Sequence, residues 1–309
     1  MTDKFMEILG NRAASLGCKY VKGAMLRDFT TFGTGGRCPM LIELSGDRSA
    51  CELVKLLNEE NVPFFVIGRG SNILAEDGDI NIIFLHTGRL MNEIRAEGNR
   101  VICEAGASLS SVCLCARDNG LTGLEFAYGI PAGVGGAVYM NAGAYGGEIK
   151  DVIEWAEAVD ERGEQVRLTA EEMDMSYRHS IFCGRKNVIT KVCFRLAKGD
   201  KDKIGEKMTE LVSRRREKQP LEYRSAGSTF KRPQGAFAAA LIEECGLKGF
   251  TVGGAQVSSK HSGFVINTGN ATYADAAAVI DHVREVVREK TGFDLECEPV
   301  IIRSSAGIS

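Results

Sequence analysis

The sequence predicts a mixed α+β protein with more than one domain. A chain of 309 residues is long enough for two or three domains and for a sizeable hydrophobic core. Helical and extended patterns alternate along the chain, and neither a repeat nor a low-complexity tract interrupts them. These observations favour a mixed multi-domain fold over a solenoid.

The elements of the first part of the chain follow from the spacing of apolar residues. After an N-terminal helix, apolar residues at 50, 53, 54 and 57 share one face of a helix that should end near Asn61 and Pro63. A second helix carries its apolar stripe at 109, 112, 113 and 116 and is closed by Asn119 and Gly120. Between these two helices, short apolar runs predict strands at residues 64–67, 81–85 and 101–104.

The middle of the chain is predicted to be β-rich, with a hairpin of residues 153–159 and 165–168, a short helix at 170–174 and a strand at 188–196. The charged segment 198–218 keeps one apolar stripe, which predicts a helix at the start of a last domain. For that domain we expect a helix at 236–245, a strand at 264–267, a helix at 273–290 and a final strand at 295–302.

Composition argues against several classes of partner. The formal net charge is -3 and both signs are mixed along the chain, so no extended basic field is available for nucleic acid or an anionic membrane. The apolar runs fall far short of the roughly 20 residues that cross a bilayer. The first residues lack the apolar core and cleavage site of an export signal. We expect neither a nucleic-acid partner nor a membrane partner.

The cysteines and histidines do not form a metal-binding pattern. Ten cysteines are scattered along the chain without a CxxC pair, and there are only four histidines. Most of the thiols are expected to be small buried hydrophobes in a reducing compartment. The sequence therefore predicts no metal ion and a cytoplasmic location.

A glycine-rich run, GIPAGVGGAVYMNAGAYGG from Gly129 to Gly147, is the most unusual stretch of the sequence. So many small residues would weaken a packed helix or strand, but they allow a backbone to approach a ligand closely. A flexible linker is the alternative, yet linkers are rich in polar residues, whereas this run contains aliphatic and aromatic side chains. We expect an ordered loop against a large cofactor.

A second glycine turn, Gly68 to Asn72, directly follows the strand predicted at 64–67. Its sequence GRGSN can present several backbone amides to one anion such as a phosphate. It lacks the third glycine of a dinucleotide fingerprint, and a simple strand-to-loop turn is the alternative. Together with the glycine-rich run, however, it could hold a pyrophosphate from two sides, as an extended dinucleotide requires.

Seven blocks of sequence, in order, resemble one enzyme family over almost the entire chain. They are VIGRGSNIL (66–74), EAGASL (104–109), GLEFAYGIPAGVGGAVYMNAGAYG (123–146), SYRHSIF (176–182), GSTFKRP (227–233), AQVSSKHSGFVIN (255–267) and LECEPVIIR (295–303). This set resembles the UDP-N-acetylenolpyruvoylglucosamine reductases, also called UDP-N-acetylmuramate dehydrogenases. The spacing between Tyr177 and Ser228 leaves no room for the extra substrate-covering loop of one subclass, so the chain resembles the shorter subclass.

The resemblance implies an α+β fold with an FAD-binding domain of the vanillyl-alcohol-oxidase (PCMH) type. That domain would span residues 33–198 as two α/β subdomains that divide near residue 97. A lead segment of residues 1–32 would pack on it, and residues 199–309 would form a C-terminal substrate-binding domain. We expect the protein to be a monomer.

The resemblance also implies the cofactors, FAD and the co-substrate NADPH. No histidine lies in GRGSN, where related flavin enzymes can attach the ring covalently, so the FAD is expected to be non-covalent. The residues expected to bind it come from the two glycine-rich loops. They are Gly68, Arg69, Gly70, Ser71, Asn72, Ile73, Ile130, Pro131, Gly133, Gly135 and Gly136.

The implied reaction belongs to peptidoglycan precursor synthesis. An enolpyruvyl ether on UDP-N-acetylglucosamine is reduced to a lactyl ether, giving UDP-N-acetylmuramate, with hydride passing from NADPH to FAD and then to the β-carbon. Negative charge then develops on the α-carbon and its carboxylate, so the protein must stabilise an enolate-like anion and protonate carbon. By the resemblance, Arg178 holds the carboxylate, Ser228 donates the proton and Glu298 is catalytic.

Each of these three residues also has a plainer interpretation. Arg178 can be interpreted as an exposed arginine after the short helix at 170–174. Ser228 can be interpreted as an ordinary turn residue beside Gly227. Glu298 can be interpreted as one of two glutamates on the solvated face of the last predicted strand. An ionised Glu298 would repel the developing anion, so we expect it to be protonated or hydrogen-bonded into a proton relay.

The resemblance places further cations and one aromatic residue near the substrate. Lys231, Lys260 and His261 could meet the UDP diphosphate, although each is equally a solvated loop residue. Tyr177 and Arg216 are the other expected contacts. Many relatives carry asparagine at the position of Arg232, so it stays open whether the longer, charged Arg232 side chain contacts the substrate diphosphate. Two rival functions remain: another FAD-dependent oxidase or dehydrogenase of the same flavin fold, and a non-catalytic nucleotide-sugar-binding relative. The blocks GSTFKRP and KHSGFVIN argue against the first, and intact Arg178, Ser228 and Glu298 against the second.

Overall fold

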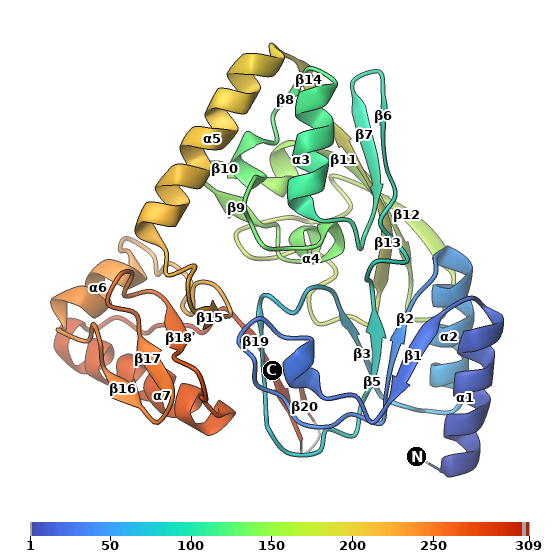
Figure 1. The fold of residues 1–309 in the computed structure, drawn as a ribbon, viewed down its shortest axis with the longest axis horizontal. Coiled ribbons are helices and arrows are strands. Elements are labelled where there is room, and N and C mark those ends of the chain that lie inside the picture. Colours follow the sequence, from blue (N-terminus) through green and yellow to red (C-terminus); the bar gives the residue numbers. More distant parts are fainter. Residues whose placement is uncertain (1, 305–306, 309) are drawn as a thin grey trace. The chain divides into compact units, whose positions relative to one another are not determined.

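The computed structural model describes residues 2–304 and 307–308, and it confirms the mixed α+β fold (Figure 1). The chain forms two compact units that interleave along the sequence. The first consists of residues up to Gly23, Pro39–Arg69 and Ile82–Arg214, and the second of Ala24–Cys38, Gly70–Asn81 and the residues from Arg215 onward. The division into domains at residues 32 and 198 stays a prediction.

The first unit begins with two helices beside a four-stranded sheet (Figure 1). The elements are α1 (Asp3–Ser15), β1 (Lys19–Lys22), β2 (Met40–Glu43), α2 (Asp47–Glu59), β3 (Phe64–Ile67) and β5 (Ile83–His86). The strands lie in the order β1-β2-β5-β3, and β5 is parallel to both of its neighbours. The predicted stripe of α2 is confirmed, because Ala50, Leu53, Val54 and Leu57 are all fully buried. Burial of each leucine is worth roughly 1.5–3 kcal/mol.

A five-stranded antiparallel sheet forms the rest of the first unit. Its strands lie in the order β12-β11-β13-β7-β6. The elements of this part are β6 (Ile94–Glu97), β7 (Arg100–Glu104), α3 (Leu109–Asp118), β8 (Leu121–Thr122), α4 (Val134–Tyr139), β9 (Gly143–Ala144), β10 (Gly147–Glu148), β11 (Ile153–Val159), β12 (Gln165–Thr169), β13 (Val188–Arg195), β14 (Ala197–Lys198) and α5 (Lys201–Lys218). Both α3 and α4 pack on this sheet. The hairpin of β11 and β12 and the predicted stripe of α3 are confirmed.

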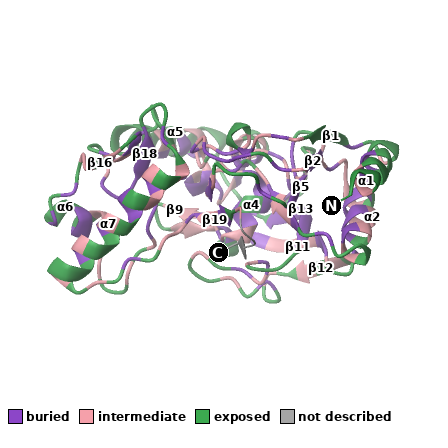
Figure 2. Ribbon diagram, turned by 90° about the horizontal axis from the view of Figure 1, so that it is seen from below, coloured by how far each residue is buried: buried purple, intermediate pink, exposed green. Residues whose placement is uncertain are grey.

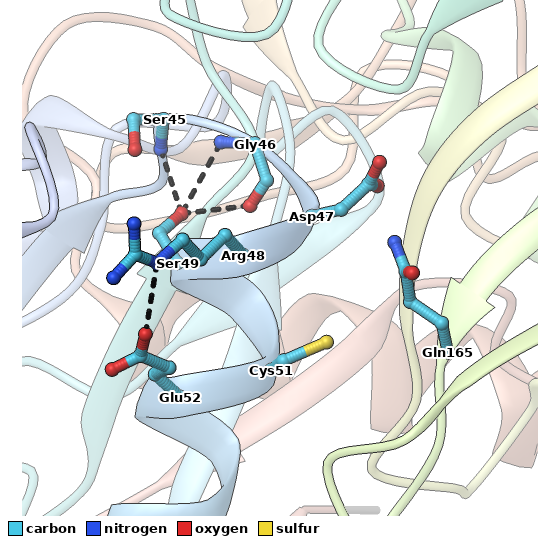
Figure 3. Close-up of a pocket in the computed structure, with 8 residues that line it drawn as sticks. All are labelled: Ser45, Gly46, Asp47, Arg48, Ser49, Cys51, Glu52 and Gln165. Atoms are coloured by element: carbon cyan, nitrogen blue, oxygen red, sulfur yellow. Dashed lines mark hydrogen bonds and ion pairs between the residues drawn. The ribbon is translucent and has the colours of Figure 1, made fainter.

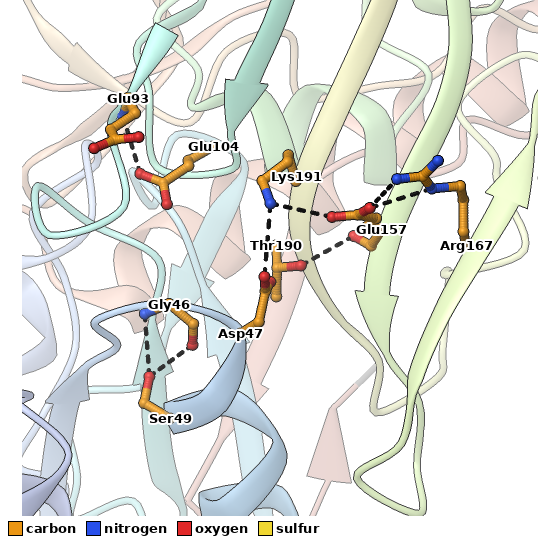
Figure 4. Close-up of polar contacts among 9 residues, drawn as sticks. All are labelled: Gly46, Asp47, Ser49, Glu93, Glu104, Glu157, Arg167, Thr190 and Lys191. Carbon is orange, nitrogen blue, oxygen red and sulfur yellow. Dashed lines mark hydrogen bonds and ion pairs between the residues drawn. The ribbon is translucent and has the colours of Figure 1, made fainter.

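Ion pairs join α2 to the five-stranded sheet (Figure 4). The Nζ of Lys191 lies 3.2 Å from Oε2 of Glu157 and 3.6 Å from Oδ2 of Asp47, the first residue of α2. Arg167 pairs with the other carboxylate oxygen of Glu157. The backbone N–H of Ala105 donates to the carbonyl of Thr190, one residue earlier on β13 than Lys191. This hydrogen bond fixes the loop between β7 and α3, against which the glycine-rich run packs.

The second unit contains two small sheets and the two C-terminal helices. Its elements are β4 (Ile73–Ala75), β15 (Arg224–Ser225), α6 (Ala238–Glu244), β16 (Thr251–Val252), β17 (Ala255–Val257), β18 (Val265–Asn267), α7 (Tyr273–Thr291), β19 (Val300–Arg303) and β20 (Gly307–Ile308). One sheet has the order β15-β18-β17-β16 and the other β20-β19-β4. The capping box of Thr272 and Asp275 starts α7, and Gly292 ends it in the left-handed conformation. Its buried stripe faces the first of these sheets, and its other face is exposed (Figure 2).

Three local predictions are wrong. The final strand begins at Val300 rather than at 295, so Glu296 and Glu298 do not lie on β19, and Pro299 between them and the strand has no N–H to donate. The segment 170–174 is a turn rather than a helix. The glycine-rich run is not all loop, because it contains helix α4 and a hairpin of β9 and β10. Small residues made this run look unsuited to regular structure, but the tertiary contacts of its backbone stabilise it.

The described part of the chain contains no helix that is both long and apolar enough to cross a membrane.

Candidate functional site

In the second unit, the turn at Gly70 is held by protein backbone. Gly70 has φ +62°, and a Cβ built on it would lie 2.0 Å from the carbonyl oxygen of Phe29. The Thr31 N–H donates to the Gly70 carbonyl at 3.1 Å. Only glycine satisfies both the left-handed conformation and this close approach. The glycine is therefore required by the fold itself, whether or not a ligand is present.

The residues that follow this turn lie directly beside two of the predicted catalytic residues. The Nδ2 of Asn72 donates to the carbonyl of Glu298 at 3.3 Å, and the Val300 N–H donates to the carbonyl of Asn72 at 2.9 Å. The N–H of Glu298 in turn donates to the carbonyl of Thr229 at 2.9 Å. A segment from the predicted cofactor turn, the Ser228 loop and the Glu298 segment thus form one hydrogen-bonded layer.

Ser228 is half-buried and follows a glycine in the left-handed conformation. Gly227 has φ +80°, and its Cβ position lies 3.8 Å from the Ser71 carbonyl. The next residue, Thr229, is buried, and its Oγ1 accepts the N–H of Val265 at 2.9 Å. These bonds hold the backbone of Ser228 against β18, so its hydroxyl is carried on a rigid support.

The predicted substrate contacts of the second unit are paired with their neighbours. Lys231 pairs with Glu296, and the Nζ of Lys260 donates to the carbonyl of Arg216 at 2.8 Å. His261 stacks edge-on against Phe264 with ring centroids 5.0 Å apart. Burial lowers the pKa of His261, so its ring is neutral at neutral pH.

The other glycine loops lie in the first unit, where Arg69 contacts the glycine-rich run. A Cβ on Gly133 would lie 3.7 Å from Cγ of Arg69. Gly135 faces inward: its N–H donates to the Ala105 carbonyl at 2.9 Å, and its Cβ position is 3.0 Å from the Cβ of Ala105. Ile130 is half-buried and Pro131 is exposed just before this contact. Arg69, in the first glycine turn, therefore lies beside the glycine-rich run.

Two glycines of these loops present open backbone. A Cβ on Gly136 would meet no described atom within 4 Å, and one on Gly68 would meet only Oγ1 of Thr87, at 3.7 Å. A ligand can therefore reach main-chain contact distance at both positions. This arrangement fits the dinucleotide that the sequence predicts, because close backbone approach is what glycine provides to a pyrophosphate.

Arg178 stands in a tight turn from Ser176 to His179. The Ser176 N–H donates to the His179 carbonyl and the His179 N–H to the Ser176 carbonyl, both at 3.1 Å. Arg178 occupies the third position of this turn with φ +55°, where glycine or asparagine is usual. Its guanidinium lies 5.0 Å from the ring centroid of the exposed Tyr177. A bulky residue in this conformation costs about 1–3 kcal/mol and points to a functional constraint.

The segment after this turn is attached to the end of α4. The Oγ of Ser180 and the Sγ of Cys183 both donate to the Tyr139 carbonyl, at 2.7 Å and 3.2 Å. The pKa of the nearby Glu148 carboxylate is lowered. The ion pair with Lys150 is the main cause, burial opposes it, and the hydrogen bond from Asn141 and the charge of Arg178 lower the pKa further. The charges of Arg178 and Glu148 therefore act on each other.

Asn141 and His86 are two residues near this site that sequence reasoning did not single out. Asn141 is fully buried with φ +43° and donates to the Ser176 carbonyl. His86 ends β5 beside Gly68, and burial lowers its pKa. An asparagine inside a glycine-rich run is a detectable signal, because asparagine tolerates the left-handed region. His86 lies beside Gly68 because β5 pairs with β3, and the sequence around His86 gives no local sign of this pairing.

A hollow of about 570 Å³ at the start of α2 contains none of the predicted site residues (Figure 3). Its polar groups already bond one another. The Oγ of Ser49 accepts the N–H groups of Ser45 and Gly46 and donates to the Gly46 carbonyl at 2.7 Å. Arg48 pairs with Glu52 at 3.0 Å. This hollow is explained by helix capping.

Among residues 2–304 and 307–308, no three histidine, cysteine or acidic side chains cluster closely enough to hold a metal ion. Six of the ten cysteines are buried, as expected of small hydrophobes.

Known proteins match this chain in both of its parts. Residues 41–169 match the model of an FAD binding domain, and residues 219–302 match the C-terminal domain of UDP-N-acetylenolpyruvoylglucosamine reductase. The chain is 47% identical over 278 residues to the UDP-N-acetylenolpyruvoylglucosamine reductase of Clostridium novyi (strain NT), covering 90% of each chain. It is 44% identical over 302 residues to that of Caldanaerobacter subterraneus subsp. tengcongensis, covering 98% of each.

A solved structure is also similar over nearly its whole length. The UDP-N-acetylenolpyruvylglucosamine reductase (MurB) from Thermus caldophilus aligns with a TM-score of 0.77 and 32% sequence identity, over 92% of this chain and 98% of that one.

Proposed function

The chain belongs to the UDP-N-acetylenolpyruvoylglucosamine reductase family, and we propose that it reduces the enolpyruvyl ether of UDP-N-acetylglucosamine to the lactyl ether of UDP-N-acetylmuramate, with NADPH as the reductant. The chain is an FAD-dependent oxidoreductase of peptidoglycan precursor synthesis. Bound FAD supplies the hydride relay between NADPH and the substrate.

The residues proposed to hold FAD without a covalent bond are those of the two glycine loops. Gly68 and Gly136 present open backbone, Arg69 lies against Gly133, and Asn72 reaches Glu298. The other members are Gly70, Ser71, Ile73, Ile130, Pro131 and Gly135. Gly70 and Gly135 act by shaping the loops, since protein atoms already fill the space beside them.

Arg178 is proposed to bind the carboxylate of the enolpyruvyl group. A guanidinium can take both carboxylate oxygens as negative charge accumulates on them, which lowers the energy of the enolate-like transition state. The hydrogen-bonded turn from Ser176 to His179 fixes the backbone from which this side chain extends.

Ser228 is proposed to donate a proton to the α-carbon, and Glu298 to support that transfer. An alcohol is a weak acid, so the strong basicity of the enolate drives the transfer. The Glu298 backbone bonds to Thr229, which places the Glu298 segment beside the serine loop. A protonated Glu298 carboxyl would return a proton to the serine alkoxide.

Substrate contacts are proposed for Tyr177, Arg216, Lys231, Lys260 and His261. The cations among them suit a UDP diphosphate, and Tyr177 offers an exposed ring beside Arg178. We further propose that the protein acts as a monomer in the cytoplasm.

The observation that carries this function is the hydrogen-bonded layer of the second unit. The side-chain amide of Asn72 bonds the Glu298 carbonyl, and the Glu298 N–H bonds the carbonyl of Thr229, so the predicted cofactor turn, Glu298 and the neighbour of Ser228 lie together within one compact unit. These segments are more than 60 residues apart in the sequence. Chance would not assemble the three motifs of one reaction in this way.

The decisive experiment follows the flavin colour through each half of the reaction. The purified protein is expected to be yellow, to bleach anaerobically with NADPH, and to regain its colour when enolpyruvyl-UDP-N-acetylglucosamine is added. Ser228→Ala should bleach normally but regain colour about 10²–10⁴-fold more slowly, because the proton donor is lost. Ser213→Ala, an exposed serine of α5, is the matched control.

Two outcomes would overturn this proposal. A wild-type protein that bleaches but is not reoxidised by the enolpyruvyl substrate would be a different flavin oxidoreductase. Rapid recovery of colour in Ser228→Ala would remove Ser228 from the role of donor.

A further inference from the structure

Asn141 makes three hydrogen bonds from a fully buried side chain. Its Nδ2 donates to the Ser176 carbonyl at 2.9 Å and to Oε2 of Glu148 at 3.1 Å. Its Oδ1 accepts the N–H of Lys150 at 2.9 Å. Both N–H donors of the amide nitrogen are thus used, one toward the Ser176 turn and one toward Glu148.

Two of these bonds lead to Arg178. The Ser176 carbonyl is also the acceptor that closes the turn in which Arg178 has φ +55°. The Glu148 carboxylate interacts with the charge of Arg178 and with the Nζ of Lys150, which lies 2.9 Å away. One amide therefore fixes both the backbone of the arginine turn and an acidic group within its electrostatic reach.

The backbone at Asn141 is itself unusual. Its φ of +43° lies in the left-handed region, which asparagine enters more readily than most residues. Glycine would enter that region at least as readily, but it would make none of the three side-chain bonds. The requirement at this position is therefore for the amide as well as for the conformation.

We propose that Asn141 is a positioning residue for the reaction, which holds the Ser176–His179 turn and Glu148 so that Arg178 keeps the orientation in which it binds the substrate carboxylate. This proposal rests on the proposed function, and it assigns the C-terminal part of the glycine-rich run to the substrate. A misplacement of about 1 Å in a reacting group can cost on the order of 10²-fold in rate, so removal of Asn141 should slow the reaction.

The test combines Asn141→Ala and Asn141→Gly with Arg178→Ala. Both Asn141 variants should slow the recovery of flavin colour by enolpyruvyl-UDP-N-acetylglucosamine about 10–100-fold through kcat. The rate of bleaching by NADPH should stay within about twofold of wild type, because Arg178 acts only on the substrate. Added to Arg178→Ala, Asn141→Ala should cost less than about twofold more, since the group that it positions is gone.

A stability comparator separates positioning from general loosening. Asn267→Ala removes an equally buried amide, whose Nδ2 donates to Phe32 and whose Oδ1 accepts from Gly269 and Ala271. It should lower Tm by an amount similar to that of Asn141→Ala, but any effect on rate should be additive with Arg178→Ala. If Asn141→Ala does not fold, the nearly isosteric Asn141→Asp, which loses both N–H donors, takes its place.

Three results overturn the proposal. Full activity of Asn141→Gly would show that only the backbone conformation matters, and a multiplicative effect with Arg178→Ala would show that Asn141 acts independently. Full activity of Arg178→Ala would overturn both the assigned role of Arg178 and the proposal that Asn141 positions it. Since Arg178→Ala is measured alone, the failure of the function and the failure of the positioning are distinguishable.

Discussion

At the scale of single residues, backbone strain distinguishes Arg178 from an ordinary surface arginine. The alternative interpretation placed it after a short helix, but it lies half-buried in a two-sided hydrogen-bonded turn with φ +55°. Strain of this kind persists only where the surrounding structure enforces it. In this protein the enforcing contacts come from Asn141, Ser180 and Cys183, which tie the segment to the glycine-rich run.

Arg178→Lys tests whether the fork geometry matters beyond charge. Lysine keeps the positive charge but cannot take both oxygens of a carboxylate, so transition-state stabilisation should fall. We expect recovery of flavin colour by the substrate to slow about 10²–10³-fold while NADPH bleaching is unchanged. Stopped-flow absorbance of the two half-reactions measures this. A lysine enzyme within threefold of wild type would show that charge alone suffices.

At the scale of elements, the glycines of the two loops separate into structural and ligand-facing ones. Gly70 is required because the Phe29 carbonyl approaches it, and Gly135 because Ala105 packs against it. Gly136, in α4, has open space where its side chain would be. The same residue type therefore serves folding at two positions and is free to serve a ligand at the third.

The variants Gly136→Ala and Gly70→Ala should behave in opposite ways. Alanine at 136 meets no steric obstacle and favours the helix, so the free energy of unfolding of the FAD-free protein should rise by about 0.5–1 kcal/mol. Its affinity for FAD should fall, because the methyl group occupies space next to the ligand-facing backbone. Alanine at 70 would collide with backbone and should lower stability by more than about 3 kcal/mol.

Thermal unfolding with and without added FAD measures both effects. The difference in Tm between the FAD-bound and FAD-free forms should shrink for Gly136→Ala, since a ligand stabilises the folded state by RT ln(1 + [L]/Kd) and a weaker affinity lowers this term. An unchanged difference would mean that FAD does not approach Gly136.

At the scale of the whole molecule, stability should decline toward acid pH in two stages. Burial lowers the pKa values of His86 and His261, so protonation of the unfolded chain below about pH 6.5 disfavours the folded state. Arg100 and Arg195 hold the pKa of Glu154 at about 2 against its usual 4.5. The stabilisation by ionised Glu154 is present above pH 4.5 and is lost as the pH falls toward 2.

Glu154→Gln should remove the contribution of Glu154 to the second stage. The variant should be less stable than wild type at pH 7 by roughly 1 kcal/mol, because the arginines are largely exposed. The difference should shrink as the pH approaches 2. Urea unfolding at several pH values measures this, with exposed Glu217→Gln as a control for the change in net charge. A difference that stays constant down to pH 2 would contradict the assignment.

Sequence alone was sufficient for elements whose signal is local. The stripes of α2 and α3, the strand Phe64–Ile67 and the β11–β12 hairpin were all predictable, because each depends on the periodicity of adjacent side chains. The family and its motifs were also readable, since they depend on residue identity and order. The helix within the glycine-rich run was not, because its support comes from distant backbone such as that of Ala105.

The sequence by itself determined the fold class, the family and the flavin cofactor, and it predicted the residues that we propose to carry the chemistry. Only the tertiary structure decided that Glu298 lies before the last strand, that Gly70 serves the fold, and that Asn141 holds the turn of Arg178. Each of these facts is a hydrogen bond or a close approach between segments far apart in the chain. Such contacts have no periodicity that a linear pattern could reveal, because they exist only once the backbone has folded.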